Sequence, residues 1–141
     1  MAELDVARIL LVEDDESFAA AVVRYLRARG YEVQRVPSAE DARASLAGPS
    51  GVSLVILDIN LPGESGWSLL RGPEYVAAGR PPVVVMTATH VHSSWLREFG
   101  VAGYLPKPFA METLLATIER ATGAKQPLPG GTPDEGDINV G

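Results

Sequence analysis

Three short apolar runs in this chain each stop at a carboxylate or a hydroxyl group, and this pattern limits the folds that the chain can adopt. The runs are residues 8–12, 54–57 and 83–86. The polar residues that follow them are, in chain order, Glu13-Asp14-Asp15, Asp58 and Thr87. Apolar, β-branched-rich runs of this length, bounded by turn residues, predict strands that are buried on both faces of a parallel sheet.

A fourth, weaker run over residues 103–106 leads into Lys107-Pro108. The C-terminal ends of parallel strands lie side by side at one edge of an open sheet, where such folds place their sites. We therefore expect carboxylates, a hydroxyl group and an ammonium group to meet in one crevice. Such a set of groups suits a divalent cation and a phosphoryl group.

The segments between these runs have helical periodicity. Asp15 is expected to cap a helix over about residues 16–29, and Ser38 is expected to open a second, shorter helix. The clearest helical pattern covers residues 111–121, with Gly123 following as the cap. Because strands and helices alternate five times, the sequence predicts a doubly wound α/β sandwich with a parallel sheet.

Length and composition exclude several classes of protein. The chain has 141 residues, a net charge of −6 and no cysteine, which fits one domain and excludes disulfides and thiolate chemistry. The negative charge disfavours direct nucleic-acid binding. The N-terminus lacks the pattern of a signal peptide, and no apolar run is long enough to span a membrane, so we expect a cytoplasmic location and no membrane partner. Residues 124–141 are rich in Pro, Gly and acidic residues and predict a flexible tail or linker.

Four motifs, taken in order, resemble the receiver domain of bacterial two-component response regulators, the CheY-like superfamily. They are Ile9-Leu10-Leu11-Val12-Glu13-Asp14-Asp15, Leu57-Asp58-Ile59-Asn60-Leu61-Pro62-Gly63, Thr87-Ala88 and Tyr104-Leu105-Pro106-Lys107-Pro108-Phe109. The resemblance covers roughly residues 7 to 123, and we expect the domain to occupy residues 1–123. It implies a flavodoxin-like fold of five βα units with the strand order 2-1-3-4-5.

The resemblance also implies a chemical role for each residue. Asp58 is expected to be the phosphoacceptor, which attacks the phosphorus of a phosphohistidine on a sensor histidine kinase or a phosphotransfer protein. Mg²⁺ is expected to bind Asp14, Asp58 and the backbone carbonyl of Asn60 directly, with Glu13 acting mostly through a water molecule. Lys107 and Thr87 are expected to contact phosphoryl oxygens.

The family further implies a cis bond between Lys107 and Pro108 and a coupled movement of Thr87 and Tyr104. The signal is then expected to change the face built from the helix near Trp95, the strand over residues 103–106 and the final helix. That face would serve a homodimer or an output partner. Trp95 itself fits either an exposed interface residue or a core anchor.

Two regions depart from the family pattern, and neither contains the chemical residues. The span from Thr87 to Lys107 is short, so we expect a short helix around residues 93–99. Gly72-Pro73 interrupts a segment that is normally one helix, which predicts a kinked or divided element. His90 and His92 are expected to be solvated rather than bound to a metal.

Two other functions compete with the receiver interpretation: a phosphohydrolase, and a flavin-binding electron carrier whose fold would match. An aspartyl-phosphate-forming phosphohydrolase usually has a second carboxylate two residues after its nucleophile, where this chain has Asn60. A flavin-binding electron carrier needs a phosphate-binding loop after the first strand, where Glu13-Asp14-Asp15 would repel a phosphate. The segment around Lys107 is similar to that of nitrogen-regulation-type regulators. However, the chain is expected to be either a stand-alone receiver or a fragment that ends in a linker.

Overall fold

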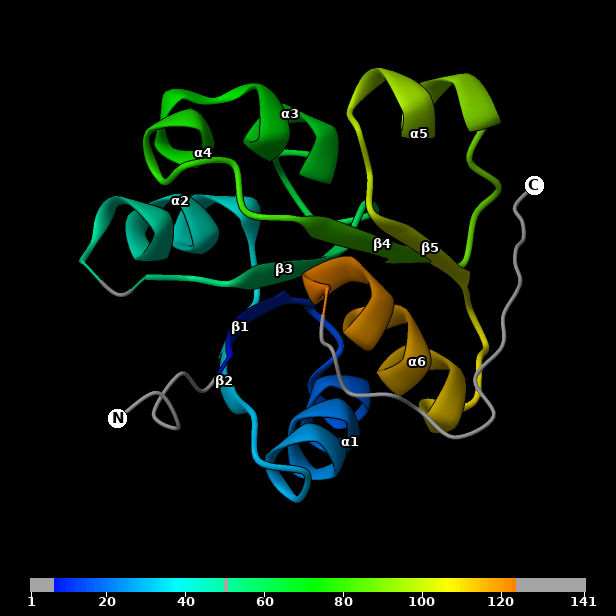
Figure 1. The fold of residues 1–141 in the computed structure, drawn as a ribbon. Coiled ribbons are helices and arrows are strands. Elements are labelled where there is room, and N and C mark those ends of the chain that lie inside the picture. The colour runs from blue at the N-terminus through cyan, green and yellow to red at the C-terminus, as the bar shows by residue number, and fades with distance from the viewer. Residues whose placement is uncertain (1–6, 50, 124–141) are drawn as a thin grey trace.

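A five-stranded parallel sheet forms the centre of the computed structural model, which describes residues 7–49 and 51–123 (Figure 1). The strands are β1 (Arg8–Val12), β2 (Glu32–Val36), β3 (Leu54–Asp58), β4 (Val83–Thr87) and β5 (Gly103–Pro106). Their order in the sheet is β2-β1-β3-β4-β5, and all four neighbouring pairs are parallel. The predicted strand order and fold class are therefore confirmed.

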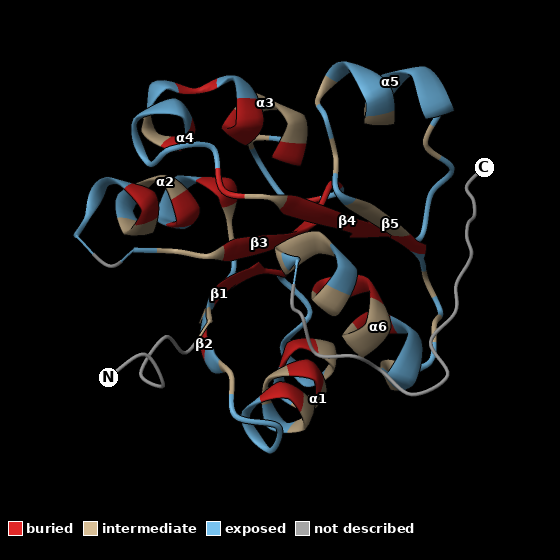
Figure 2. Ribbon diagram, viewed as in Figure 1, coloured by how far each residue is buried: buried red, intermediate tan, exposed pale blue. Residues whose placement is uncertain are grey.

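Helices cover both faces of this sheet (Figure 1). They are α1 (Glu16–Arg27), α2 (Ala39–Ala47), α3 (Gly66–Arg71), α4 (Pro73–Ala77), α5 (Ser93–Glu98) and α6 (Met111–Thr122). Two of them, α1 and α6, pack on one face, and the other four lie on the opposite side. The strands β1, β3 and β4 are almost wholly buried between the layers, whereas the edge strand β2 alternates buried and more exposed positions (Figure 2).

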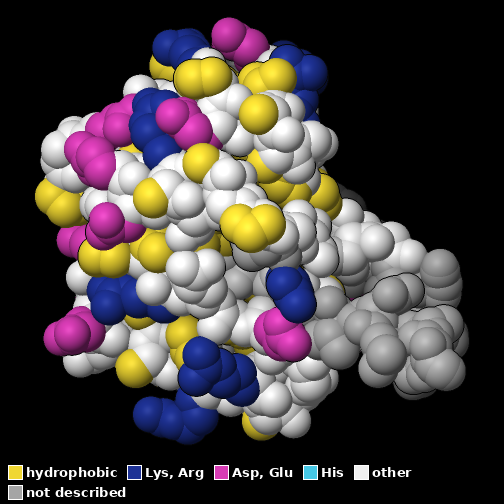
Figure 3. Space-filling view, turned by 90° about the vertical axis from the view of Figure 1, so that its left-hand side faces the viewer, with side chains coloured by type: hydrophobic (Ala, Val, Ile, Leu, Met, Phe, Trp, Pro, Cys, Tyr) yellow, Lys and Arg dark blue, Asp and Glu magenta, His cyan; other side chains and the backbone are white. Residues whose placement is uncertain are grey.

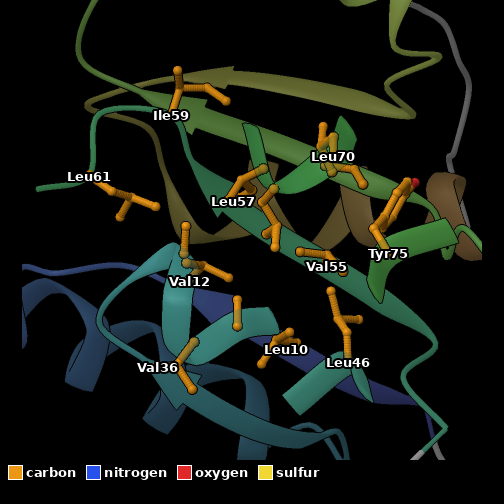
Figure 4. Close-up of a cluster of buried hydrophobic side chains, with 14 of the residues drawn as sticks. Leu10, Val12, Val36, Leu46, Val55, Leu57, Ile59, Leu61, Leu70 and Tyr75 are labelled. Atoms are coloured by element: carbon orange, nitrogen blue, oxygen red, sulfur yellow. The ribbon is translucent and has the colours of Figure 1, made fainter. Parts of the chain in front are cut away.

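Two apolar clusters form the core, one on each face of the sheet. On the first face, Leu10, Val55 and Leu57 of the strands pack against Leu46 of α2 and Leu70 of α3 (Figure 4). On the other face, alternate residues of the same strands point toward α1 and α6. This alternation follows from the two-residue period of a strand, which turns successive side chains to opposite faces of the sheet.

Local signals in the sequence explain where several helices begin and end. The side chain of Asp15 accepts a hydrogen bond from the backbone N–H of Phe18, and Ser38 accepts one from Asp41. The final helix ends at Gly123, whose φ of 68° lies in the left-handed region. The first helix ends at Arg27, earlier than expected, and the chain then turns through a left-handed Gly30.

The segment around Gly72-Pro73 is divided into two short helices, α3 and α4, as the sequence predicts. Proline is the first residue of α4, a position that needs no N–H donor. Arg43 of α2 forms ion pairs with Glu64, before α3, and with Glu74 of α4. Nη2 of Arg43 also donates to the carbonyl of Ser68 in α3 at 3.4 Å, so Arg43 joins α2 to both halves of the divided element.

The helix α5 is short, as expected, with six residues, none of them buried. In the part of the chain that the structure describes, no helix is long and apolar enough to cross a membrane. Figure 3 shows acidic and basic side chains interspersed on one side of the molecule, with no continuous basic surface on that face.

Candidate functional site: an acidic crevice at the sheet edge

The strand ends bring polar side chains together, as the sequence predicts. Asp58 is the last residue of β3 and Thr87 is the last residue of β4, while Glu13 directly follows β1. All three are buried despite their polarity, with exposed fractions of 1% for Glu13, 5% for Asp58 and 0% for Thr87. Buried carboxylates are costly unless they have partners, so their contacts determine what the crevice can do.

Lys107 provides the positive charge in this crevice. Its Nζ lies 2.8 Å from Oε1 of Glu13 and 3.1 Å from Oδ2 of Asp58. The backbone N–H of Lys107 donates to the carbonyl of Thr87 at 2.9 Å, which fixes the chain at the end of β5. The ammonium group also lies 4.5 Å from the ring centroid of Phe18. One cation therefore serves two carboxylates that are far apart in the sequence.

Glu13 is held at both carboxylate oxygens and at its backbone. Its Oε2 accepts a hydrogen bond from the N–H of Asp15 at 3.0 Å, and its carbonyl accepts one from Nε of Arg35 at 2.9 Å. Burial raises the pKa of Glu13, although the hydrogen bond from Lys107 acts in the opposite direction. Burial alone would lower the pKa of Lys107, but its hydrogen bonds to Glu13 and Asp58 outweigh this effect and raise it.

A third carboxylate, that of Asp14, completes an acidic cluster. One oxygen from each of Glu13, Asp14 and Asp58 lies within 4.8 Å of the other two. Within residues 7–49 and 51–123, no other group of three His, Cys, Asp or Glu side chains gathers in this way. Three oxygen donors, two buried and one exposed, make a donor set that fits a hard divalent cation such as Mg²⁺.

Asn60 connects the phosphoacceptor candidate to the end of β4. Its backbone N–H donates to Oδ1 of Asp58 at 2.9 Å. Its side-chain Nδ2 donates to the hydroxyl oxygens of Thr87 and Thr89, both at 2.9 Å. The Thr87 hydroxyl also accepts a 3.2 Å hydrogen bond from the N–H of Thr89. The Thr87 hydroxyl is therefore held by the loop that follows Asp58.

The sequence did not reveal three of these contacts: the amide bridge of Asn60, the Arg35 bond to Glu13, and the Phe18 ring beside Lys107. No local sequence pattern predicts these contacts, because each joins residues that only the fold brings together. Tyr104 is half-buried in β5, near the first core cluster. The bond between Lys107 and Pro108 is cis, as expected.

The two histidines do not join the crevice cluster. His90 and His92 are both exposed, and Nδ1 of His92 accepts a hydrogen bond from the N–H of Ser94 at the start of α5. This agrees with the expectation that they are solvated.

The sheet order and the acidic crevice define a receiver-type α/β domain. The family model of the response regulator receiver domain matches residues 9–119. The chain therefore belongs to the response regulator receiver family, whose standard function is that of a phosphoacceptor in two-component systems.

Curated relatives support the same family. The chain is 38% identical over 122 residues to the regulatory protein VanRB of Enterococcus faecalis, a match that covers 83% of this chain and 54% of the relative. It is also 38% identical over 130 residues to the response regulator protein FleR of Pseudomonas aeruginosa, covering 91% of this chain and 27% of that relative. The chain thus matches about half of the first relative and about a quarter of the second.

Solved structures show the same fold. A CheY-like receiver domain protein from Methanospirillum hungatei matches with a TM-score of 0.77 and 25% identity, covering 84% of this chain and 95% of that one. The non-phosphorylated HemR receiver domain of Leptospira biflexa matches with a TM-score of 0.73 and 31% identity, covering 87% and 99% of the two chains.

Proposed function

We propose that Asp58 of this receiver domain accepts a phosphoryl group from a phosphohistidine on a sensor histidine kinase or a phosphotransfer protein. The observation that carries the proposal is the buried Asp58 carboxylate, which shares one ammonium group, that of Lys107, with Glu13. The ammonium group offsets the negative charge that would otherwise repel an incoming phosphoryl group. The partner kinase implies that the domain works in the cytoplasm.

The transfer step forms one bond and breaks one. An oxygen of Asp58 attacks phosphorus, the bond from phosphorus to the donor imidazole nitrogen breaks, and that nitrogen keeps the electron pair and takes up a proton. Lys107 would hold one phosphoryl oxygen by charge and hydrogen bonding. Thr87 would donate its hydroxyl hydrogen to another. Such a reaction depends on positioning and charge neutralisation more than on covalent help from the protein.

Mg²⁺ is the cofactor that the donor set favours. Asp14, Asp58 and the backbone carbonyl of Asn60 would hold it directly, and Glu13 would act through a water molecule. Both carboxylate oxygens of Glu13 already accept hydrogen bonds, whereas Asp14 is exposed, and this supports the division of roles. When bound, Mg²⁺ neutralises negative charge between the carboxylates and the phosphoryl group.

Thr87 and Tyr104 would carry the signal away from the crevice. In the structure, the Thr87 hydroxyl accepts hydrogen bonds from Asn60 and Thr89. A phosphoryl oxygen on Asp58 would instead accept a hydrogen bond from this hydroxyl and draw Thr87 toward Asp58. Movement of Thr87 would free space for the half-buried ring of Tyr104, a two-state change biased by a local charge. The face formed by α5, β5 and α6 would then control an output domain or a partner.

The domain would act as a switch that promotes only its own phosphorylation and dephosphorylation. A phosphohydrolase would need an acid or base two residues after Asp58. That position is Asn60, whose amide is already bonded to two threonine hydroxyls. Direct contact with nucleic acid is not part of the proposal, because the chain has a net charge of −6.

The test is incubation with acetyl phosphate and Mg²⁺, followed by measurement of acid-labile phosphate. The wild-type chain should gain one phosphate, and Asp58→Asn should gain none. Asp41→Asn, which neutralises a carboxylate in the first turn of α2, is the matched control and should be labelled like the wild type. Stoichiometric labelling of Asp58→Asn would overturn the assignment.

A further inference from the structure

Phe18, in the first turn of α1, contacts Lys107, and the transfer step proposed above gives this contact no role. Nζ of Lys107 lies over the ring of Phe18, 4.5 Å from its centroid. The same Nζ donates hydrogen bonds to Oε1 of Glu13 and to Oδ2 of Asp58. The ammonium group therefore meets two charged hydrogen-bond partners and an aromatic ring that carries no charge.

The ring of Phe18 is itself held in place from two directions. The backbone N–H of Phe18 donates to the side chain of Asp15, which caps α1. The ring of Phe109 meets the Phe18 ring edge to face, with centroids 5.8 Å apart and an angle of 81° between the planes. Phe109 follows Lys107 by two residues, and both rings pack against the second core cluster. The segment that carries Lys107 thus also helps to fix the ring beside it.

A contact between a cation and an aromatic face has properties that suit a moving ammonium group. The ring quadrupole attracts a cation within about 6 Å of the centroid. This attraction needs no N–H group aimed at a particular atom, unlike a hydrogen bond. When Asp58 accepts a phosphoryl group, its negative charge passes to the phosphoryl oxygens, so Lys107 must exchange the hydrogen bond to Asp58 for one to a phosphoryl oxygen. The contact with the ring can persist through this exchange.

We propose that Phe18 is a positioning residue for phosphoryl transfer. Its ring holds the ammonium group of Lys107 in the crevice while this group passes from the carboxylate of Asp58 to a phosphoryl oxygen. The inference rests on the phosphoacceptor role proposed for Asp58. An aliphatic side chain of similar size would fill the same space but would not attract the cation, and this difference separates positioning from packing.

The test measures the rate at which acetyl phosphate and Mg²⁺ phosphorylate the full chain. Phe18→Leu should lower the rate at least about threefold, whereas Phe18→Tyr, which keeps an aromatic face, should stay within about twofold of the wild type. Phenylalanines with increasing numbers of fluorine atoms, incorporated at position 18, give the sharper result. Fluorine withdraws electron density from the ring face and keeps the ring apolar, so the rate should fall with each added fluorine.

Phe99 is the matched control for the fluorinated series. Its ring also lies beside a cation, 5.1 Å from the guanidinium group of Arg71, but outside the crevice. The same series at position 99 should leave the rate within about twofold of the wild type, and denaturant unfolding checks the stability of each variant. A rate that does not change along the series at position 18 would overturn the proposal, and so would equal losses of rate at positions 18 and 99.

Nuclear magnetic resonance tests the contact without phosphorylation. The chain has two lysines, Lys107 and Lys125, so the full chain labelled with ¹³C-lysine gives two sets of side-chain signals. The ring current of Phe18 should shift the ε-methylene signals of Lys107 upfield, and Phe18→Leu should abolish this shift. A wild-type chain without the shift would overturn the proposal. A wild-type chain that shows the shift but takes up no phosphate would instead overturn the function proposed for Asp58.

Discussion

Two networks of ion pairs in this domain each join one cation to two carboxylates, and they differ in burial. In the crevice, Lys107 lies between Glu13 and Asp58. On the opposite layer, Arg43 lies between Glu64 and Glu74. The Glu13 side chain is 1% exposed, whereas that of Glu64 is 20% exposed. Each cluster has one cation for two carboxylates, so composition alone does not separate a reactive site from a structural contact.

Burial changes what these charges do. Burial raises the pKa of Glu13, so the folded state disfavours its charged form. Hydrogen bonds from Arg43 and Ser68 lower the pKa of Glu64 to about 2, so the folded state favours its charged form. The crevice therefore holds the negative charge of Glu13 at a cost to stability, and this suits it to bind a cation. The Arg43 cluster instead joins three helices.

The largest expected effect is on the rate of phosphorylation, which should depend on Lys107 and not on Arg43. Lys107→Met should lower the rate of phosphorylation by acetyl phosphate at least about a hundredfold, because it removes the charge that meets the phosphoryl oxygens. Arg43→Met, the matched control, should leave that rate unchanged and lower the free energy of unfolding by roughly 1 kcal/mol. The rate is measured from acid-labile phosphate and stability from denaturant unfolding. Equal losses of rate in both variants would show that the clusters do not differ in function.

A smaller effect is expected for Mg²⁺ binding. Asp14→Asn should weaken binding at least about tenfold, because it removes a direct ligand. Glu13→Gln should weaken it less, since both oxygens of Glu13 already accept hydrogen bonds within the protein. Glu74→Gln, which changes the other cluster, should have no effect. Isothermal titration calorimetry gives the three affinities, and equal losses for Asp14→Asn and Glu13→Gln would contradict the division of roles.

Glu13 and Glu64 should contribute to the free energy of unfolding with opposite dependences on pH. Because the pKa of Glu13 is raised in the folded state, its contribution is fully present below the ordinary value of 4.5 and is lost as the pH rises through the folded pKa. Because the pKa of Glu64 is lowered, its contribution is present above 4.5 and is lost as the pH falls toward about 2.

At pH 7 without Mg²⁺, Glu13→Gln should therefore raise the free energy of unfolding, because it removes a carboxylate whose charged form the folded state disfavours, while Asp58 still pairs with Lys107. Glu64→Gln should lower it. The control is Glu98→Gln, which should leave the free energy of unfolding unchanged. Glu98 is exposed and has no ion pair among the described residues. Denaturant unfolding between pH 3 and pH 7 would detect the opposite slopes, that of Glu64 below pH 4.5 and that of Glu13 above it. A loss of stability at pH 7 in both test variants would contradict the role given to burial.

The smallest effect is expected from residues 124–141, which lie outside the described residues. Their content of Pro, Gly and acidic residues offers little apolar surface to bury. Deleting them should leave the melting temperature within about 5 °C of the full chain, equivalent to roughly 1 kcal/mol for a domain of this size. The phosphorylation rate should also be unchanged. A larger fall in melting temperature would mean that these residues pack on the domain.

Much of the fold and the outline of the crevice could be predicted from the sequence. Asp58 and Thr87 are the last residues of apolar strands, and parallel strands place their C-terminal ends at one edge of the sheet. The pattern of apolar runs was therefore sufficient to predict that both residues lie near Glu13. Capping by Asp15 and Ser38 is local chemistry, as is the division of the helix at Gly72-Pro73, and both are confirmed.

The remaining contacts depend on geometry that no local pattern contains. Arg43 meets Glu64 and Glu74 across 21 and 31 residues of chain, and any exposed arginine on α2 would look the same in the sequence. The amide of Asn60 reaches Thr87 and Thr89 only because the loop after β3 lies beside the end of β4. For Trp95 the sequence left two alternatives open, and the ring is both packed against Trp67 and exposed.

The most direct test of the role of Asp58 is to find which carboxylate carries the phosphoryl group. Borohydride reduces an acyl phosphate to an alcohol and releases phosphate, so a phosphorylated aspartate becomes homoserine. After treatment with acetyl phosphate and Mg²⁺, peptide mass spectrometry should find homoserine at position 58 alone, and none when Mg²⁺ is removed. Homoserine at position 14 or 15, with Asp58 unchanged, would contradict the assignment of the phosphoacceptor.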